Sequence, residues 1–208
     1  MARRGIFIVL EGPDKSGKST QARFLARSLR ARGREVLHTR EPGGTPFAEA
    51  IRRILLDPKN RLHPLAELLL YEASRAQHTW EVILPALRRG AVVLCERYTM
   101  ATLAYQGYGR GLSLPMIRSL NRMASARLEP DLTVVLDMPE RDFSRRDATR
   151  RHDRLERESS LFRSKVARAY RRLARTEPRA RLVDTSGGIP AARRRIESLV
   201  QNLLSRRK

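Results

Sequence analysis

The chain of 208 residues lacks several features that define particular protein classes. Its single cysteine, Cys95, cannot form an internal disulfide and fits a reducing compartment. No run of about 18 apolar residues occurs, so no membrane span is predicted. No apolar leader segment precedes the first predicted strand, and no repeat or linker divides the chain. We therefore expect a cytoplasmic protein with one domain over residues 1–208.

Aromatic residues are also scarce, and the basic residues are unevenly divided between two types. Aromatics make up 5% of the chain, which leaves few stacking platforms for single-stranded nucleic acid. Lysine occurs only at positions 15, 18, 59, 165 and 208, so nearly all of the 43 basic residues are arginines, and the net charge is +21. Such a charge is compatible with nucleic-acid binding. Acidic residues alternate with the arginines, as over residues 154–158, which favours solvated helix faces and anionic ligands instead.

The most specific motif of the chain is a glycine-rich loop at residues 12–19. It matches the phosphate-loop pattern G-x-x-x-x-G-K-[ST], between an apolar run at 6–10 and a helical pattern at 20–29. Glycines let the backbone wrap a polyphosphate, and the helix N-terminus adds partial positive charge. Lys18 and Ser19 have the chemistry to contact the β/γ-phosphates and Mg²⁺. We predict an ATP-binding set of Gly12, Pro13, Asp14, Lys15, Ser16, Gly17, Lys18, Ser19 and Thr20.

Apolar runs and helical patterns alternate along the rest of the chain. Strands are predicted at 6–10, 35–39, 91–95, 132–136 and 181–183. Helices are predicted at 20–29, 47–56, 65–88, 114–127, 158–176 and 190–205. The runs at 91–95 and 132–136 are apolar on both faces, as in a parallel sheet covered by helices. This order predicts an α/β fold with ligands at the carboxyl ends of the strands.

Polar and aromatic clusters follow the predicted strands. TREPGGT (39–45) follows the second strand, and LLYEASR (69–75) lies in the next long helix. ERY (96–98) and AYQGYGRG (104–111) follow the third strand, and an arginine-rich segment follows the fourth. Together these clusters place cations and aromatic rings around one phosphate loop.

This set resembles the thymidylate kinase family of nucleoside monophosphate kinases over nearly the whole chain. TREPGGT and AYQG are its most specific parts. The resemblance implies a P-loop kinase fold, with a five-stranded parallel sheet flanked by helices on both faces and a mobile lid at about 143–156. It also implies a homodimer that transfers the γ-phosphate of ATP to dTMP with Mg²⁺, giving dTDP and ADP. No membrane partner is expected, because the chain has no long apolar run.

The resemblance also implies roles for individual residues in binding the acceptor. Tyr71 would stack on thymine, Arg75 would donate to its O4, and Thr102 would contact its N3 edge. Tyr105 would block a ribose 2′-hydroxyl, and Arg97 would bind the acceptor phosphate. The full acceptor set is Asp14, Arg40, Pro42, Tyr71, Arg75, Arg97, Thr102, Tyr105 and Gln106.

Two anions must meet in this reaction, which requires cations more than a strong base. The expected catalytic cations are Lys15, Lys18, Arg97, Arg150 and Arg151. The expected Mg²⁺ ligands are Ser19, Asp14 and Glu96, and adenine is expected to lie near Ser186 and Gly187.

The chain departs from the family at Glu96, where aspartate is usual, and at Ala101, where serine is frequent. These departures leave a catalytically weak paralogue as one alternative function. A kinase for another monophosphate such as dUMP is a second alternative, since only a methyl group separates dUMP from dTMP. A P-loop module that binds nucleic acid through the net charge of +21 is a third.

Overall fold

A five-stranded parallel sheet forms the centre of the computed structural model, which describes residues 4–138 and 153–206. The strand order is β2-β3-β1-β4-β5, and every neighbouring pair is parallel. The strands are β1 (Ile6–Glu11), β2 (Val36–Arg40), β3 (Val92–Glu96), β4 (Leu132–Asp137) and β5 (Ala180–Asp184). All five predicted strands are confirmed, with each end within one residue of its predicted position.

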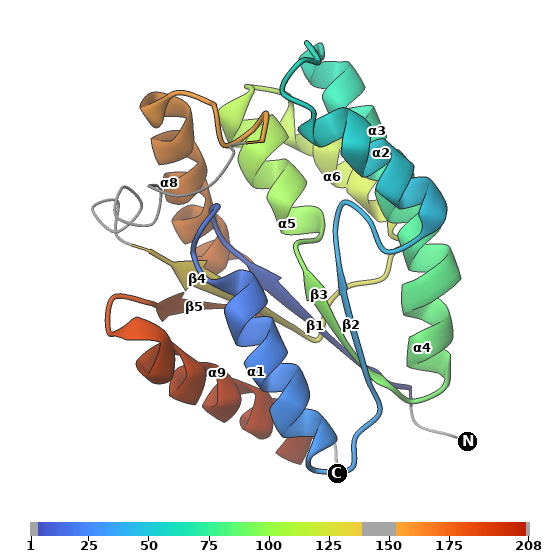
Figure 1. Ribbon diagram of the computed structural model, residues 1–208, viewed down its shortest axis with the longest axis vertical. Coiled ribbons are helices and arrows are strands. Elements are labelled where there is room, and N and C mark those ends of the chain that lie inside the picture. The colour runs from blue at the N-terminus through green and yellow to red at the C-terminus, as the bar shows by residue number, and fades with distance from the viewer. Residues whose placement is uncertain (1–3, 139–152, 207–208) are drawn as a thin grey trace.

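Helices cover both faces of the sheet because its central strands are apolar on both sides (Figure 1). Ile6, Ile8 and Leu10 of β1 pack against α1 (Lys18–Arg30) and α9 (Gly188–Ser205). Phe7 and Val9 point to the other face, against α4 (Leu84–Arg88). On that face α8 (Ser160–Thr176) covers β4 and β5. Because all strands are parallel, their carboxyl ends meet at one edge of the sheet.

The helix predicted at 65–88 is divided into three parts. These are α3 (Pro64–His78), the π-helical turn η1 (Thr79–Ile83) and α4. Pro85 lacks an N–H group and its ring clashes with the carbonyl of the preceding turn, and the wider π-turn relieves this conflict. Helix α3 packs between α2 (Pro46–Leu56) and α6 (Leu114–Ala124). No helix among the described residues is both long and apolar enough to cross a membrane.

Two further helical segments lie where the sequence predicts none. They are α5 (Thr99–Thr102) and the π-helix η2 (Leu103–Gly109). The glycines of this tract weaken the helical pattern, but Gly109 has a packing role, since an added Cβ would lie 2.7 Å from the Phe162 ring. The π-helix brings Tyr105 and Gln106 to the edge of the sheet that carries the phosphate loop.

Candidate active site

The phosphate loop joins β1 to α1, and its conformation depends on left-handed backbone angles. Gly12 and Gly17 have φ of 134° and 95°, and Lys15 has φ of 63°. A Cβ at Gly12 would lie 2.5 Å from the Leu136 carbonyl oxygen, so this position requires glycine. All nine predicted ATP-binding residues from Gly12 to Thr20 lie on this loop and the first turn of α1.

Lys18 folds back across the loop. Its ammonium group donates to the carbonyl oxygens of Gly12 at 3.1 Å and Pro13 at 2.7 Å. Burial and the nearby positive charge of Arg97 lower the pKa of Lys18 to about 7, although Asp14 and two other carboxylates act in the opposite direction. The lysine is therefore held in place, and an anionic ligand would stabilise its charged form.

Ser19 and Glu96 meet beside the loop. The Ser19 hydroxyl donates to the Glu96 carboxylate, and His38 Nε2 lies 2.9 Å from the other carboxylate oxygen. Burial favours the neutral form of Glu96, but hydrogen bonds from His38 and Ser19 and the charge of Lys18 outweigh it and lower its pKa. The pair presents a hydroxyl oxygen and an ionised carboxylate next to the phosphate loop.

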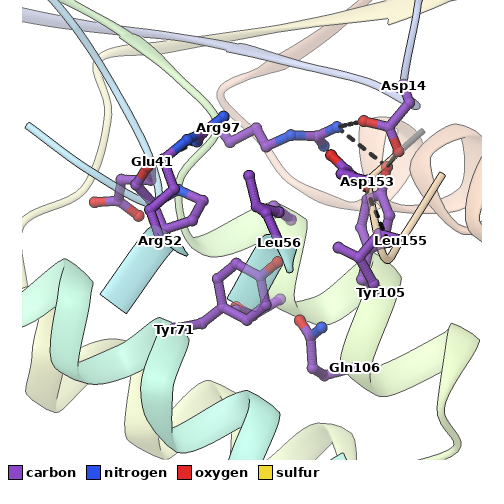
Figure 2. Close-up of a pocket in the computed structure, with 13 residues that line it drawn as sticks. Asp14, Glu41, Arg52, Leu56, Tyr71, Arg97, Tyr105, Gln106, Asp153 and Leu155 are labelled. Atoms are coloured by element: carbon purple, nitrogen blue, oxygen red, sulfur yellow. Dashed lines mark hydrogen bonds and ion pairs between the residues drawn. The ribbon is translucent and has the colours of Figure 1, made fainter. Parts of the chain in front are cut away.

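Arg97 connects the phosphate loop with the neighbouring pocket (Figure 2). It follows β3 with a left-handed φ of 67°, a strained geometry often found at functional sites. Its guanidinium donates to the Gly12 carbonyl at 3.1 Å, to the Asp14 carboxylate, and to the Tyr105 hydroxyl at 3.1 Å. The Tyr105 hydroxyl in turn donates to Asp14 Oδ2 at 2.8 Å. Burial opposes the charge on Asp14, yet Arg97, Lys18 and Tyr105 hold its pKa below the ordinary value.

Glu11 lies beneath this junction and was not predicted from the sequence. Its fully buried carboxylate accepts hydrogen bonds from the Tyr98 backbone at 2.8 Å and from the Tyr170 hydroxyl at 2.9 Å. The Tyr170 hydroxyl also accepts from Arg97 at 3.1 Å. Burial raises the pKa of Glu11 above its ordinary value. A carboxylate that ends an otherwise apolar strand was the available signal.

A pocket opens beside Arg97, between the strand ends and α3. Seven of the nine predicted acceptor residues line it. The lining consists of Asp14, Glu41, Pro42, Arg52, Leu56, Tyr71, Arg97, Ala101, Thr102, Tyr105, Gln106, Asp153 and Leu155. Figure 2 shows the Tyr71 ring and the Gln106 amide facing this space from α3 and η2.

The other two predicted acceptor residues, Arg75 and Arg40, do not line the pocket. Arg75 is buried behind it, where its guanidinium pairs with Glu41 at 2.8 Å and Glu72 at 2.9 Å and donates to Asn121 at 2.7 Å. Arg40 is half exposed and pairs with Glu49. Both arginines thus form ion pairs within the protein, and Arg75 Nη1 also lies 3.4 Å from the hydroxyl oxygen of the pocket residue Thr102, so their contacts with the acceptor stay predictions.

Arg52 is a pocket residue that sequence reasoning missed. It lies on α2, and its Nη1 donates to the Pro42 carbonyl oxygen at 2.8 Å. Burial and the positive charge of Arg40 lower the pKa of Arg52 below its ordinary value. The sequence predicted only a helix at 47–56, and nothing in it indicates that Arg52 turns toward the pocket.

The remaining predicted residues lie around the phosphate loop or outside the described ranges. Ser186 and Gly187 precede α9, and the turn is tied to α1 by a 3.0 Å hydrogen bond from Gln21 to the Ile189 carbonyl. Arg150, Arg151 and most of the predicted lid lie outside the described residues.

Known proteins are similar to this chain in both architecture and sequence. A thymidylate kinase family model matches residues 10–196. The chain is 50% identical to a thymidylate kinase of Syntrophotalea carbinolica, with 96% of each chain covered. It is 48% identical to one of Pseudomonas putida, which covers 97% of this chain and 99% of the relative. A crystal structure of thymidylate kinase from Ehrlichia chaffeensis matches with a TM-score of 0.78 and 30% identity, over 95% of this chain and 99% of that one. The similarity thus includes both the loop and the pocket.

Proposed function

The chain belongs to the thymidylate kinase family and phosphorylates dTMP to dTDP, and we propose that this reaction takes place where the phosphate loop and the pocket meet. The observation that carries the proposal is the position of Arg97. Its guanidinium contacts the loop at Gly12 and Asp14 and the pocket at Tyr105. An arginine at this junction can contact both the phosphate that leaves ATP and the phosphate that receives it.

The loop holds ATP, and the pocket holds dTMP. Lys18 contacts the β/γ-phosphates, and the first turn of α1 adds its partial positive charge. In the pocket, Tyr71 stacks on the thymine ring while Thr102 and Gln106 contact its polar edge. Tyr105 occupies the space of a ribose 2′-hydroxyl and so selects deoxyribose.

The reaction needs alignment of two anions rather than a strong base. An oxygen of the dTMP phosphate bonds to the γ-phosphorus, while the bond from that phosphorus to the β–γ bridging oxygen breaks, which gives dTDP and ADP. Because the acceptor is already ionised, no proton has to be removed first. Lys18, Arg97 and Lys15, with the predicted lid residues Arg150 and Arg151, stabilise the charge on the transferring group.

The residues beside the loop fit a magnesium ion. Mg²⁺ prefers oxygen ligands, and Ser19 with the ionised Glu96 supplies two such groups in mutual contact. Asp14 was also expected to bind the metal, but its carboxylate oxygens accept hydrogen bonds from Arg97 and Tyr105. We therefore assign the metal to Ser19 and Glu96, where it would neutralise charge on the ATP phosphates.

A homodimer is supported by exposed apolar side chains on α2, α3 and α6. Helix α3 packs against both α2 and α6, so the three helices lie next to one another (Figure 1). Phe47 of α2, Leu69 of α3 and Met123 of α6 are 54%, 48% and 75% exposed. Apolar groups on neighbouring helices are typical of a protein–protein interface. We propose that a second copy of the chain covers them. The single buried thiol, Cys95, supports a cytoplasmic protein.

The decisive experiment is a coupled ADP-release assay over dTMP, dUMP, dCMP, dGMP and UMP. We expect dTMP to have the highest kcat/KM and dUMP to be a poor but measurable substrate, since a single methyl contact discriminates by only about 1–3 kcal/mol. The Lys18→Ala and Arg97→Ala variants serve as inactive controls. Faster turnover of dUMP or UMP than of dTMP would overturn the assignment. Tight salt-dependent DNA binding without turnover would favour the nucleic-acid module.

A further inference from the structure

Glu67 lies on α3, one helical turn before Tyr71, and its side chain is fully buried. Its carboxylate accepts hydrogen bonds from Gln106 Nε2 at 2.7 Å and from Arg110 Nη2 at 3.1 Å. It also forms an ion pair with Arg154 Nη1 at 2.6 Å. A buried carboxylate is costly without partners, and this one has partners from two other segments of the chain.

These partners belong to the walls of the acceptor pocket. Gln106 lines the pocket from η2, whereas Arg154 lies between two lining residues, Asp153 and Leu155. Arg154 is fixed further by a 2.7 Å hydrogen bond from Nε to the Leu55 carbonyl oxygen at the end of α2. The Glu67 carboxylate therefore sits where α3, η2 and the segment at 153–155 converge.

Glu67 also determines which way the Gln106 amide faces. Burial favours a neutral carboxyl, but hydrogen bonds from Arg110 and Gln106 and the charges of Arg110 and Arg154 hold the pKa of Glu67 below its ordinary value. An ionised carboxylate only accepts hydrogen bonds, so Gln106 must donate through Nε2. Its carbonyl oxygen is then left for the pocket, and Figure 2 shows this oxygen on the side of Tyr71.

We propose that Glu67 is a positioning residue for base selection, because it keeps an acceptor oxygen of Gln106 directed at the base. This inference rests on the proposed function, which places the dTMP base beside Tyr71. Thymine carries a ring N–H that can donate to such an oxygen. Cytosine carries an unprotonated ring nitrogen at the same place and is disfavoured.

The test compares three single-residue variants with the wild-type protein. Glu67→Gln keeps the shape of the side chain, but its new amide can donate to Gln106 and so permits the reversed amide. We expect kcat/KM for dTMP to fall about tenfold, mainly through a higher KM for dTMP, with the KM for ATP unchanged. The preference for dTMP over dCMP should fall as well. Glu67→Asp keeps a carboxylate, which only accepts hydrogen bonds. This variant should retain the preference for dTMP over dCMP even if its thermal stability is lower.

Glu158→Gln is the matched control. Glu158 is the second ion partner of Arg110, at 2.6 Å, whereas the side-chain amide of Gln106 donates to Glu67 and not to Glu158. Removing its charge should leave the preference for dTMP over dCMP at the wild-type value. This variant separates a general weakening of the ion pairs from the specific orientation of Gln106.

The outcomes distinguish this inference from the proposed function. A wild-type protein without dTMP kinase activity would overturn the function itself. An active wild type, with Glu67→Gln retaining its dTMP KM and base preference, would overturn only the role of Glu67. If Glu67→Gln does not fold, Glu67→Asp decides alone, since loss of base preference in that variant contradicts the proposal.

Discussion

Replacing Tyr105 by phenylalanine removes one oxygen atom from the junction between the phosphate loop and the acceptor pocket. That hydroxyl donates to Asp14 Oδ2 at 2.8 Å and accepts from Arg97 Nη2 at 3.1 Å. The ring itself lies near Phe162 and Tyr170, with centroids at 6.2 and 6.3 Å. The substitution therefore removes two polar contacts and leaves the apolar packing in place.

The magnitude follows from the charge on Asp14. A hydrogen bond to a charged group contributes about 1.5–3 kcal/mol. Asp14 keeps its contact with Arg97, so we expect a loss near the lower limit, about 1.5 kcal/mol or roughly tenfold in kcat/KM for dTMP. The KM for ATP should change little. The ring still fills the space of a 2′-hydroxyl, so the preference for dUMP over UMP should persist.

The assay is ADP release at varied dTMP with saturating ATP, followed by the same measurement with dUMP and UMP. Tyr108→Phe is the control, because Tyr108 lies on the same π-helix but outside the pocket, with its ring near the Arg172 guanidinium at 5.9 Å. It should behave as wild type. A Tyr105→Phe enzyme within twofold of wild type, or a similar loss in both variants, would refute the reasoning.

Three further predictions concern the nucleotide, the metal and the assembly. Burial and Arg97 lower the pKa of Lys18 to about 7, so above pH 7 the free lysine is largely neutral and ATP binding should be accompanied by proton uptake. Calorimetry at pH 8 in buffers of different ionisation enthalpy measures this uptake, and its absence would contradict the prediction. Glu96→Ala should raise the Mg²⁺ concentration at half-maximal activity about tenfold, and an unchanged metal titration would remove Glu96 from the site. Leu69→Glu should shift a dimer to monomers in sedimentation velocity, whereas a wild-type monomer would exclude the proposed interface.

The phosphate loop was predictable because its function is local in sequence. Glycines at positions 12 and 17 allow the left-handed angles that the loop requires, and eight consecutive residues carry the motif. The strands were also predictable, since each contains a short run of apolar residues flanked by polar residues or glycine. Neither conclusion needed information about distant parts of the chain.

The acceptor pocket was only partly predictable because distant elements build it. In the sequence, Glu67 looks like an ordinary acidic residue in the first turn of a helix, where its negative charge interacts favourably with the helix dipole. Its burial depends on Arg110 and Arg154, which come from later segments. Arg75 lies one turn from Tyr71, and that spacing predicted a shared pocket. The buried partners Glu41 and Glu72 instead hold Arg75 behind the wall.

The described charges at the junction also limit how the reaction can be stabilised. Asp14 and Glu96 have lowered pKa values and face Lys18 and Arg97, so two carboxylates oppose two cations once an anionic ligand favours the charged form of Lys18. Both basic side chains are positioned before a nucleotide arrives, which reduces the reorganisation needed during the reaction. These two pairs nearly cancel, so they alone supply little positive charge for two polyanionic nucleotides. The additional charge must come from Lys15 and Arg52, from a metal ion at Glu96 and from further arginines around the cleft, and activity should depend on these groups.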